Sequence, residues 1–349
     1  MGMNKRLKLQ GSRFFLSKIG ILCLVLAFSN LGCGGGGSTS TAGFTRYAFP
    51  ANRIATDHIH NQAWGTFGSS SPYPNAIVEI DTSTGRIGTP IPVGSEPDAI
   101  GLSADGKIAY VGLDGSSKVR IVDLQTRTAG ATISYSSIEN DPNMVPDKIS
   151  VNPVNSGDFA IGVVSTQGGF KRGPYYFHNG VVLNPPADPI DGCESIGWIN
   201  STNFIRMQSG GSGLFTRYGV TPSAVSILQT VYTHFTFTGN FHFTNANSVI
   251  TDDGRIFSTS DFTLIGTIGL GQGLLSVDTD PNRKMAWASM GGTSPATIRA
   301  YELGNFTPTA ELVVDMNGEN YGQLMRFGAN GLVISSRSAI YVMKTAPGI

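Results

Sequence analysis

The chain has 349 residues, of which 40% are hydrophobic and 9% aromatic, so it holds enough apolar material for a large core and disorder is excluded for most of its length. Its 45 glycines and its low charged content of 14% suit a protein of many short strands and tight turns. The formal net charge is zero, but residues 1–32 contain five basic residues and no acid, which leaves 19 basic and 24 acidic residues in the remainder. An acidic remainder argues against nucleic acid as a partner.

The first 32 residues have the layout of a secretory signal peptide. Residues 1–18 are basic, and Ile19 to Phe28 form an uninterrupted apolar run. This run is too short for a membrane-spanning helix, which needs roughly 20 apolar residues. We therefore expect the mature protein to be exported.

The end of this leader resembles a bacterial lipobox, because Asn30, Leu31 and Gly32 lead directly into Cys33 after the apolar run. The usual pattern has Leu where Asn30 stands. The resemblance implies lipidation of Cys33 and, with Gly34 after the cysteine, an address on the outer membrane or cell surface. The alternative is cleavage after Ser29, which would give a soluble periplasmic or secreted protein. Residues 33–43, rich in Gly, Ser and Thr, are expected to form a flexible tether.

A repeated unit follows and is clearest between Asp98 and Gly112, where two apolar strands flank a turn that contains Asp105 and Gly106. This pattern indicates a hairpin. A third strand is expected at 118–123 and a fourth at 130–134. The same order begins at Arg53, with a hairpin at 53–66 and a further strand at 75–81. Later copies begin near Asp147, Glu194, Asn240, Gln272 and Gln323.

Seven hairpin starts, mostly 45–50 residues apart, predict a seven-bladed β-propeller of four-stranded antiparallel blades over residues 44–349. The last copy, 323–343, contains only three strands. The spare strand at 44–49 is expected to pair into that blade and close the ring, which removes an exposed sheet edge. Deletion of residues 43–49 should then promote aggregation.

Several segments resemble YVTN-type propeller repeats, namely residues 94–98, 110–112 and 80–85. The segment 323–332 is similar to the last-blade motif of uncharacterised bacterial YncE-like propellers, with Phe327 where that motif usually has Trp. The resemblance covers roughly residues 45–345. It implies the propeller fold and says little about function, because propellers support many activities.

Histidines and cysteines offer few candidates for chemistry. His58 and His60 share one hairpin turn and form a possible metal pair, although exposed polar residues are ordinary there. His178 is expected in a surface turn, and His234 and His242 border the fifth blade. Cys193 is the one mature cysteine besides Cys33, so no disulfide framework is predicted.

One polar residue stands two positions before the first apolar residue of nearly every innermost strand. In a propeller these strand starts converge on one mouth of the central channel. One interpretation is that the side chains cap backbone N–H groups of neighbouring strands. The other is a site for a polar ligand or a divalent cation such as calcium. Calcium should then stabilise the fold, and Asp147→Asn should abolish the effect. The seven residues are Asn52, Asp98, Asp147, Glu194, Asn240, Gln272 and Gln323.

No nucleophile–base pair, haem motif or phosphate-binding loop is recognisable in the sequence. The leading hypothesis is therefore a non-catalytic binding or scaffold propeller, monomeric and anchored to the cell envelope, with a protein or small molecule as its partner. The alternative is an enzyme of the propeller lactonase or lyase type. Arg326, Glu194 and His242 are the set of channel residues that such an enzyme would use.

Overall fold

The computed structural model describes most of the chain beyond the leader. All described residues belong to one compact unit that spans Gly37–Ile349. The leader and residues 33–39 and 42–43 of the predicted tether, Cys33 among them, lie outside the described residues. No helix in the described part is long and apolar enough to cross a membrane. The described ranges are 40–41, 44–81, 86–137, 139, 141–183, 192–209, 213–237, 239–269, 274–291, 295–316, 318–328 and 331–344.

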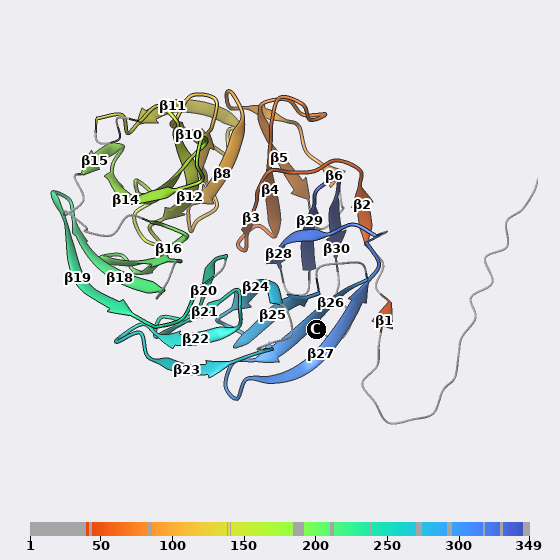
Figure 1. Cartoon of the computed structure of the whole chain (residues 1–349). Coiled ribbons are helices and arrows are strands. Elements are labelled where there is room, and N and C mark those ends of the chain that lie inside the picture. The colour runs from red at the N-terminus through yellow and green to blue at the C-terminus, as the bar shows by residue number, and fades with distance from the viewer. Residues whose placement is uncertain are drawn as a thin grey trace, which may run out of the picture. The chain divides into compact units, whose positions relative to one another are not determined.

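The first four blades are antiparallel sheets that follow one another along the chain (Figure 1). Blade 1 contains β3 (Ile54–Asp57), β4 (Gln62–Phe67), β5 (Ala76–Asp81) and an outer strand in two pieces, β6 (Arg86–Ile87) and β7 (Ile91–Pro92). Blade 2 contains β8 (Pro97–Leu102), β9 (Ile108–Leu113), β10 (Lys118–Asp123) and β11 (Thr128–Ser134). Blade 3 contains β12 (Met144–Val151), β13 (Asp158–Ser165), β14 (Lys171–His178) and β15 (Val181–Leu183). Blade 4 contains β16 (Ser195–Asn200), β17 (Asn203–Gln208), β18 (Leu214–Thr221) and β19 (Ala224–Tyr232).

Three further sheets complete the set of blades. Blade 5 contains β20 (Phe241–Asn245), β21 (Ser248–Thr251), β22 (Arg255–Ser258) and β23 (Leu264–Thr267). Blade 6 contains β24 (Leu274–Asp280), β25 (Met285–Met290), β26 (Ala296–Glu302) and β27 (Thr307–Val314), with the short β1 (Ser40–Thr41) added in parallel to its outer edge. Blade 7 contains β28 (Tyr321–Phe327), β29 (Gly331–Ser336), β30 (Ile340–Met343) and, from the other end of the chain, β2 (Thr45–Tyr47).

The innermost strands form a closed ring. Every innermost strand contacts the innermost strand of the next blade, and β28 of the last blade contacts β3 of the first. In chain order these strands are β3, β8, β12, β16, β20, β24 and β28. The predicted seven-bladed propeller with four-stranded antiparallel blades is thereby confirmed. The predicted closure is also confirmed, because β2 pairs antiparallel with β30 and completes the last blade.

The core lies between the blades, where the apolar faces of neighbouring sheets pack together. One buried cluster joins Phe67 and Val78 of blade 1 to Phe327 and Val333 of blade 7. Between blades 2 and 3, the ring of Phe159 lies 4.2 Å from that of Tyr110, measured between centroids. This packing holds the inner strands in fixed positions around the channel.

Register shifts interrupt the pairing at the start of several innermost strands. In β8 the shift falls between Pro97 and Ile100, and in β12 it falls between Pro146 and Lys148. β28 is shifted in the same way between Tyr321 and Leu324. A bulge breaks the alternation of side chains and leaves backbone groups without ladder partners. Asp98, Asp147 and Gln323 lie within these bulges, which explains why polar residues occur there.

Candidate functional site

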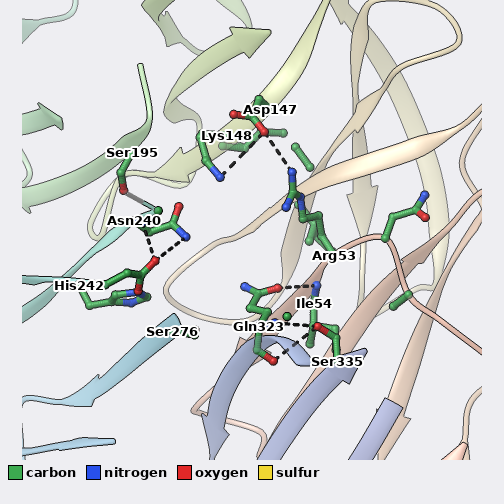
Figure 2. A pocket seen from close by; sticks show the side chains of 18 of the residues that line it. Arg53, Ile54, Asp147, Lys148, Ser195, Asn240, His242, Ser276, Gln323 and Ser335 are labelled. Carbon is green, nitrogen blue, oxygen red and sulfur yellow. Dashed lines mark hydrogen bonds and ion pairs between the residues drawn. The ribbon is translucent and has the colours of Figure 1, made fainter. Parts of the chain in front are cut away.

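A polar cavity of about 960 Å³ lies where the innermost strands begin, and residues from all seven blades line it (Figure 2). This volume falls in the usual range for small-molecule sites. Its polar and basic lining residues include Asn52, Arg53, Asp147, Lys148, Ser195, Asn240, His242, Asp252, Ser276, Gln323, Ser335 and Arg337.

Many of these side chains cap the backbone of a neighbouring blade. The amide of Asn52 donates from Nδ2 to the carbonyl of Pro97 at 2.8 Å, and Oε1 of Gln323 accepts from the N–H of Ile54 at 3.3 Å. Ser195, Asp252 and Ser276 accept from inner-strand N–H groups of the next blade in the same way. Gln323 thus caps a backbone N–H group, as the capping interpretation describes, whereas Asn52 bonds to a backbone carbonyl instead. Each of these two amides keeps one polar end that is not used for this bond.

Blades 1 to 3 are joined at the cavity by an ion-pair network around Arg53. Its guanidinium lies 3.1 Å from Oδ1 of Asp147 and 3.3 Å from Oδ2 of Asp98. Asp147 is also contacted by Lys171, at 3.0 Å from Oδ2, and by Lys148, at 3.9 Å from Oδ1. Three cationic side chains thus surround one buried carboxylate, and Asp98 shares the first of them.

The two carboxylates respond differently to this network. Burial raises the pKa of Asp98, and the nearby charge of Asp147 adds to the effect while Arg53 opposes it. Burial also disfavours the ionised form of Asp147, but Lys148, Lys171 and Arg53 outweigh it and hold its pKa below the usual range. Asp147 is therefore the ionised centre of the network, and side-chain cations compensate its charge.

His242 lies on the opposite side of the cavity, in blade 5, between two carboxylates. Its Nε2 is 3.4 Å from Oδ1 of Asp252 and its Nδ1 is 3.9 Å from Oδ1 of Asp278. Burial disfavours the imidazolium, yet Asp252 and then Asp278 raise the pKa of His242 above its ordinary value. The Nε2 atom is buried without an aligned hydrogen bond. Asn240 donates to the other oxygen of Asp252, from its N–H at 2.6 Å.

The seven residues singled out in the sequence are only partly brought together. Asn52, Asp147, Asn240 and Gln323 line the cavity. Asp98 is not part of the lining, but its carboxylate contacts Arg53, which is. The carboxylate of Glu194 accepts instead from the N–H of Ser209 at 3.0 Å, and this residue is not part of the lining. Gln272 lies outside the described residues.

The donor set does not suit the calcium site that the sequence suggested. Asp147 is already compensated by Arg53, Lys148 and Lys171, and a divalent ion beside it would face repulsion from all three cations. Over the described ranges, no group of three His, Cys, Asp or Glu residues lies close enough to hold a metal ion. Stabilisation by calcium stays a prediction, tested by melting curves with calcium and with chelator.

The three residues considered for an enzyme are held by separate neighbours. Arg326 is buried, lies 2.9 Å from Asp280 and covers the ring of Trp287, with its guanidinium carbon 3.8 Å from the ring centroid. Glu194 bonds to the backbone of Ser209, and His242 lies beside Asp252. Arg326 therefore acts as a structural link between blades 6 and 7.

The remaining histidines and the cysteine have structural surroundings. His60 pairs with Asp57 at 2.6 Å in the first hairpin turn, where His58 also lies. His178 is the last residue of β14, directly before a turn, and pairs with Asp158 at 2.8 Å. Cys193 is fully buried, and burial raises the pKa of its thiol to about 12, so the thiol is unreactive.

Sequence reasoning missed the cations of the site. Arg53 and Lys148 each follow one of the predicted polar residues by one position, where regular strand alternation would place them on the opposite face. Asp252 was missed because it precedes Asp253 and Gly254, which indicate a hairpin turn.

Asp114 provides a test of the electrostatics at this end of the channel. It is half-buried, and its Oδ1 has no hydrogen-bond partner. Burial raises its pKa to about 7, with added repulsion from Asp98 and Asp147. The pKa of this carboxyl is higher in the folded state than in the unfolded state. The free energy of unfolding therefore falls as the pH rises from about 4, the unfolded pKa, through about 7, the folded pKa. We expect Asp114→Asn to stabilise the protein by about 1–2 kcal/mol at pH 8, after allowance for solvent screening, and to change little at pH 4.

Urea unfolding of both proteins at the two pH values measures this effect. The control is Asp105→Asn, in an exposed turn where a hydrogen bond from Ser103 lowers the pKa of the carboxyl. It should not stabilise the protein at pH 8. An Asp114→Asn gain of equal size at pH 4 and pH 8 would contradict the assignment.

Comparisons with known proteins agree with this architecture. No family model and no curated protein matches the chain. Among solved structures, the β-propeller domain of Cps50 (Swd1) from Myceliophteria thermophila superposes with a TM-score of 0.64 at 12% identity, over 88% of this chain and 100% of that one. U3-55K gives a TM-score of 0.59 at 10% identity, over 88% and 100% of the two chains. The WD40 repeats of RRP9 give 0.60 at 10% identity, over 88% and 99%. Such low identities show the fold alone, which is the seven-bladed β-propeller that these solved structures share with the chain.

Proposed function

We propose that this protein is a non-catalytic binding module of the bacterial cell envelope, exported by its leader and held at the outer membrane or cell surface by a lipid on Cys33. The observation that carries the binding role is the polar cavity at the channel mouth, which is built by side chains from all seven blades. A closed ring keeps these side chains in place before a ligand arrives, which lowers the cost of binding. The partner is a small molecule in the cavity or a protein on the surrounding face.

The ion-pair network supports a rigid site. Arg53 of blade 1 contacts carboxylates from blades 2 and 3, so ion pairs link these three blades at the cavity. The chain joins the ring at β1 of the tether, which pairs with β27, and then at β2, where Arg46 pairs with Glu319 at 2.7 Å. A lipid on Cys33 would then hold a preformed site close to the membrane through residues 34–43.

One observation favours the alternative of a propeller enzyme. His242 beside Asp252 is the arrangement of a base and the carboxylate that orients it, and both line the cavity. Among the described residues, however, no hydroxyl or thiol is hydrogen-bonded to His242, while Arg326 and Glu194 are engaged elsewhere. The binding role therefore has the stronger support.

The anchoring part of the proposal predicts a change of cell fraction. Expressed in a Gram-negative host, the natural chain should be found in the membrane fraction and should incorporate a labelled fatty acid. Cys33→Ser should remove the label and move the protein to the soluble fraction, because the acyl chains supply the membrane affinity. Fractionation, immunoblotting and metabolic labelling measure both effects.

Cys193→Ala is the matched control, since this cysteine is buried inside the ring. It should leave both the label and the fraction unchanged. If Cys33→Ser fractionates like the natural chain and carries no less label, the lipid anchor is wrong and cleavage after Ser29 is favoured.

A further inference from the structure

Lys148 is the cation of the network whose bonding is least complete. Its ammonium lies 3.9 Å from Oδ1 of Asp147, which is beyond hydrogen-bond distance. The two oxygens of Asp147 are approached more closely by Arg53, at 3.1 Å, and by Lys171, at 3.0 Å. Lys148 thus retains its three N–H donors for a partner in the cavity that it lines (Figure 2).

The β-bulge at Asp147 explains the direction of this lysine. Consecutive residues of a regular strand point to opposite faces, but the shifted register between Pro146 and Lys148 interrupts this order. As a result Asp147, Lys148 and Ile149 all line the cavity. Bulges often redirect side chains beside functional sites.

The charges around Lys148 favour a negatively charged partner. Burial lowers the pKa of its ammonium, and the charges of Arg53 and Lys171 lower this pKa further. The charge of Asp147 raises it, and that of Asp252 raises it more weakly. A bound anion would relieve this repulsion between cations. Across the cavity, Nε2 of His242 is buried and lies 3.4 Å from Oδ1 of Asp252, without an aligned hydrogen bond.

The amides of the lining add a second kind of recognition. Asn52 donates its Nδ2 hydrogens to Pro97 and leaves Oδ1, whereas Gln323 uses Oε1 for Ile54 and leaves Nε2. Asn240 supplies another amide from blade 5. Amide groups that both donate and accept match hydroxyl groups, which also do both.

From these observations we propose that the cavity binds a small hydroxylated carboxylate of the sugar-acid class, with Lys148 pairing with the carboxylate and the amides contacting the hydroxyls. This inference rests on the proposed binding function and names its ligand class. The available volume of about 960 Å³ is ample for a six-carbon acid with ordered water.

The test is binding of sodium D-gluconate to the purified full-length chain, in the presence of chelator so that calcium has no part. Gluconate should raise the melting temperature as its concentration rises, because it binds the folded state. Glucose, which has the hydroxyls without the charge, should bind at least tenfold more weakly. Lys148→Met should weaken gluconate binding by about tenfold to a hundredfold, as expected for loss of a charge-assisted hydrogen bond.

Lys171→Met is the matched control, because Lys171 contacts the same Asp147 and is not part of the lining. It should change gluconate affinity less than twofold. Equal losses in the two variants would overturn the role of Lys148, since the effect would then come from Asp147. Inorganic phosphate is tested in parallel, and stabilisation by phosphate alone would overturn the sugar-acid class.

A second measurement needs no variant. Cyanate carbamylates the neutral form of a lysine, and a carboxylate on Lys148 should slow this reaction at least fivefold in the natural chain, as measured by mass spectrometry of the peptide. Unchanged modification together with unchanged melting would overturn the inference. The fractionation of Cys33→Ser is independent of this result, so failure of the ligand class and failure of the envelope role are distinguishable.

Discussion

Removal of residues 43–49 is expected to lower the melting temperature by about 10 °C or more and to cause aggregation, because the strand that completes blade 7 is lost. Without β2, the outer edge of β30 loses its partners for Ile340, Tyr341 and Val342. The same deletion removes Phe49, whose ring centroid lies 5.3 Å from that of Tyr73 and 5.8 Å from that of Phe67. Burial of a few such aromatic groups contributes about 3–5 kcal/mol.

Calorimetry and size-exclusion chromatography measure the two effects of the deletion. Arg46→Ala is the control, since it keeps the backbone of β2 and removes only side-chain contacts near the surface, namely the ion pair with Glu319 and the contacts with Tyr341. Such pairs contribute little to stability, so this variant should stay monomeric and melt within a few degrees of the parent. A deletion variant that melts at the parent temperature and stays monomeric would show that the ring does not need β2.

The architecture could be predicted because it depends on a pattern that repeats along the chain. The third strand of blade 2 was expected at 118–123, and β10 has these bounds. The spare strand expected at 44–49 contains β2, at Thr45–Tyr47. Strand pairing follows from local alternation of apolar residues and from turn residues, and both are visible in a single sequence.

The site was less predictable because it depends on departures from that pattern. Equivalent positions in the repeats suggested that Asp98, Asp147 and Glu194 would share one opening, and the first two do meet at Arg53. The longer side chain of Glu194 reaches the N–H of Ser209 in its own blade. Such a choice depends on which backbone group is free nearby, and the sequence does not contain that information.

The bulge in β12 had the largest consequence for the site. Alternation would place Lys148 on the face opposite Asp147, yet both residues line the cavity. A single inserted residue is difficult to recognise in a strand without an alignment of related sequences. Lys148 was missed for this reason, and the carboxylates alone suggested a metal ion.

Arg326→Ala is expected to destabilise the protein by about 3–5 kcal/mol, because it removes a large buried side chain and leaves the partly exposed Asp280 without its cation. Arg326 is 2% exposed and lies 2.9 Å from Asp280. Its guanidinium carbon is 3.8 Å from the centroid of Trp287, so the substitution also leaves a cavity over the indole. The main-chain N–H of Arg326 donates to Asp278 at 2.6 Å, which fixes β28 against β24. Urea unfolding of the two proteins at pH 7 measures the difference.

Arg299→Ala provides the matched comparison within blade 6. Arg299 pairs with Glu311 at 2.6 Å, but both side chains are partly exposed, so its removal should cost about 1 kcal/mol or less.

Arg326→Met separates the packing contribution from the ion-pair contribution at the buried site, because it refills part of the volume and still leaves Asp280 without its cation. Burial opposes ionisation of Asp280, and the hydrogen bond from Arg326 holds its pKa below the ordinary value. The stability that this pair contributes is present above about pH 4 and is lost as the pH falls through the lowered pKa. The gap between Arg326→Met and the parent should therefore narrow at pH 3, and a gap of the same size at pH 3 and pH 7 would assign the effect to packing against Trp287 alone.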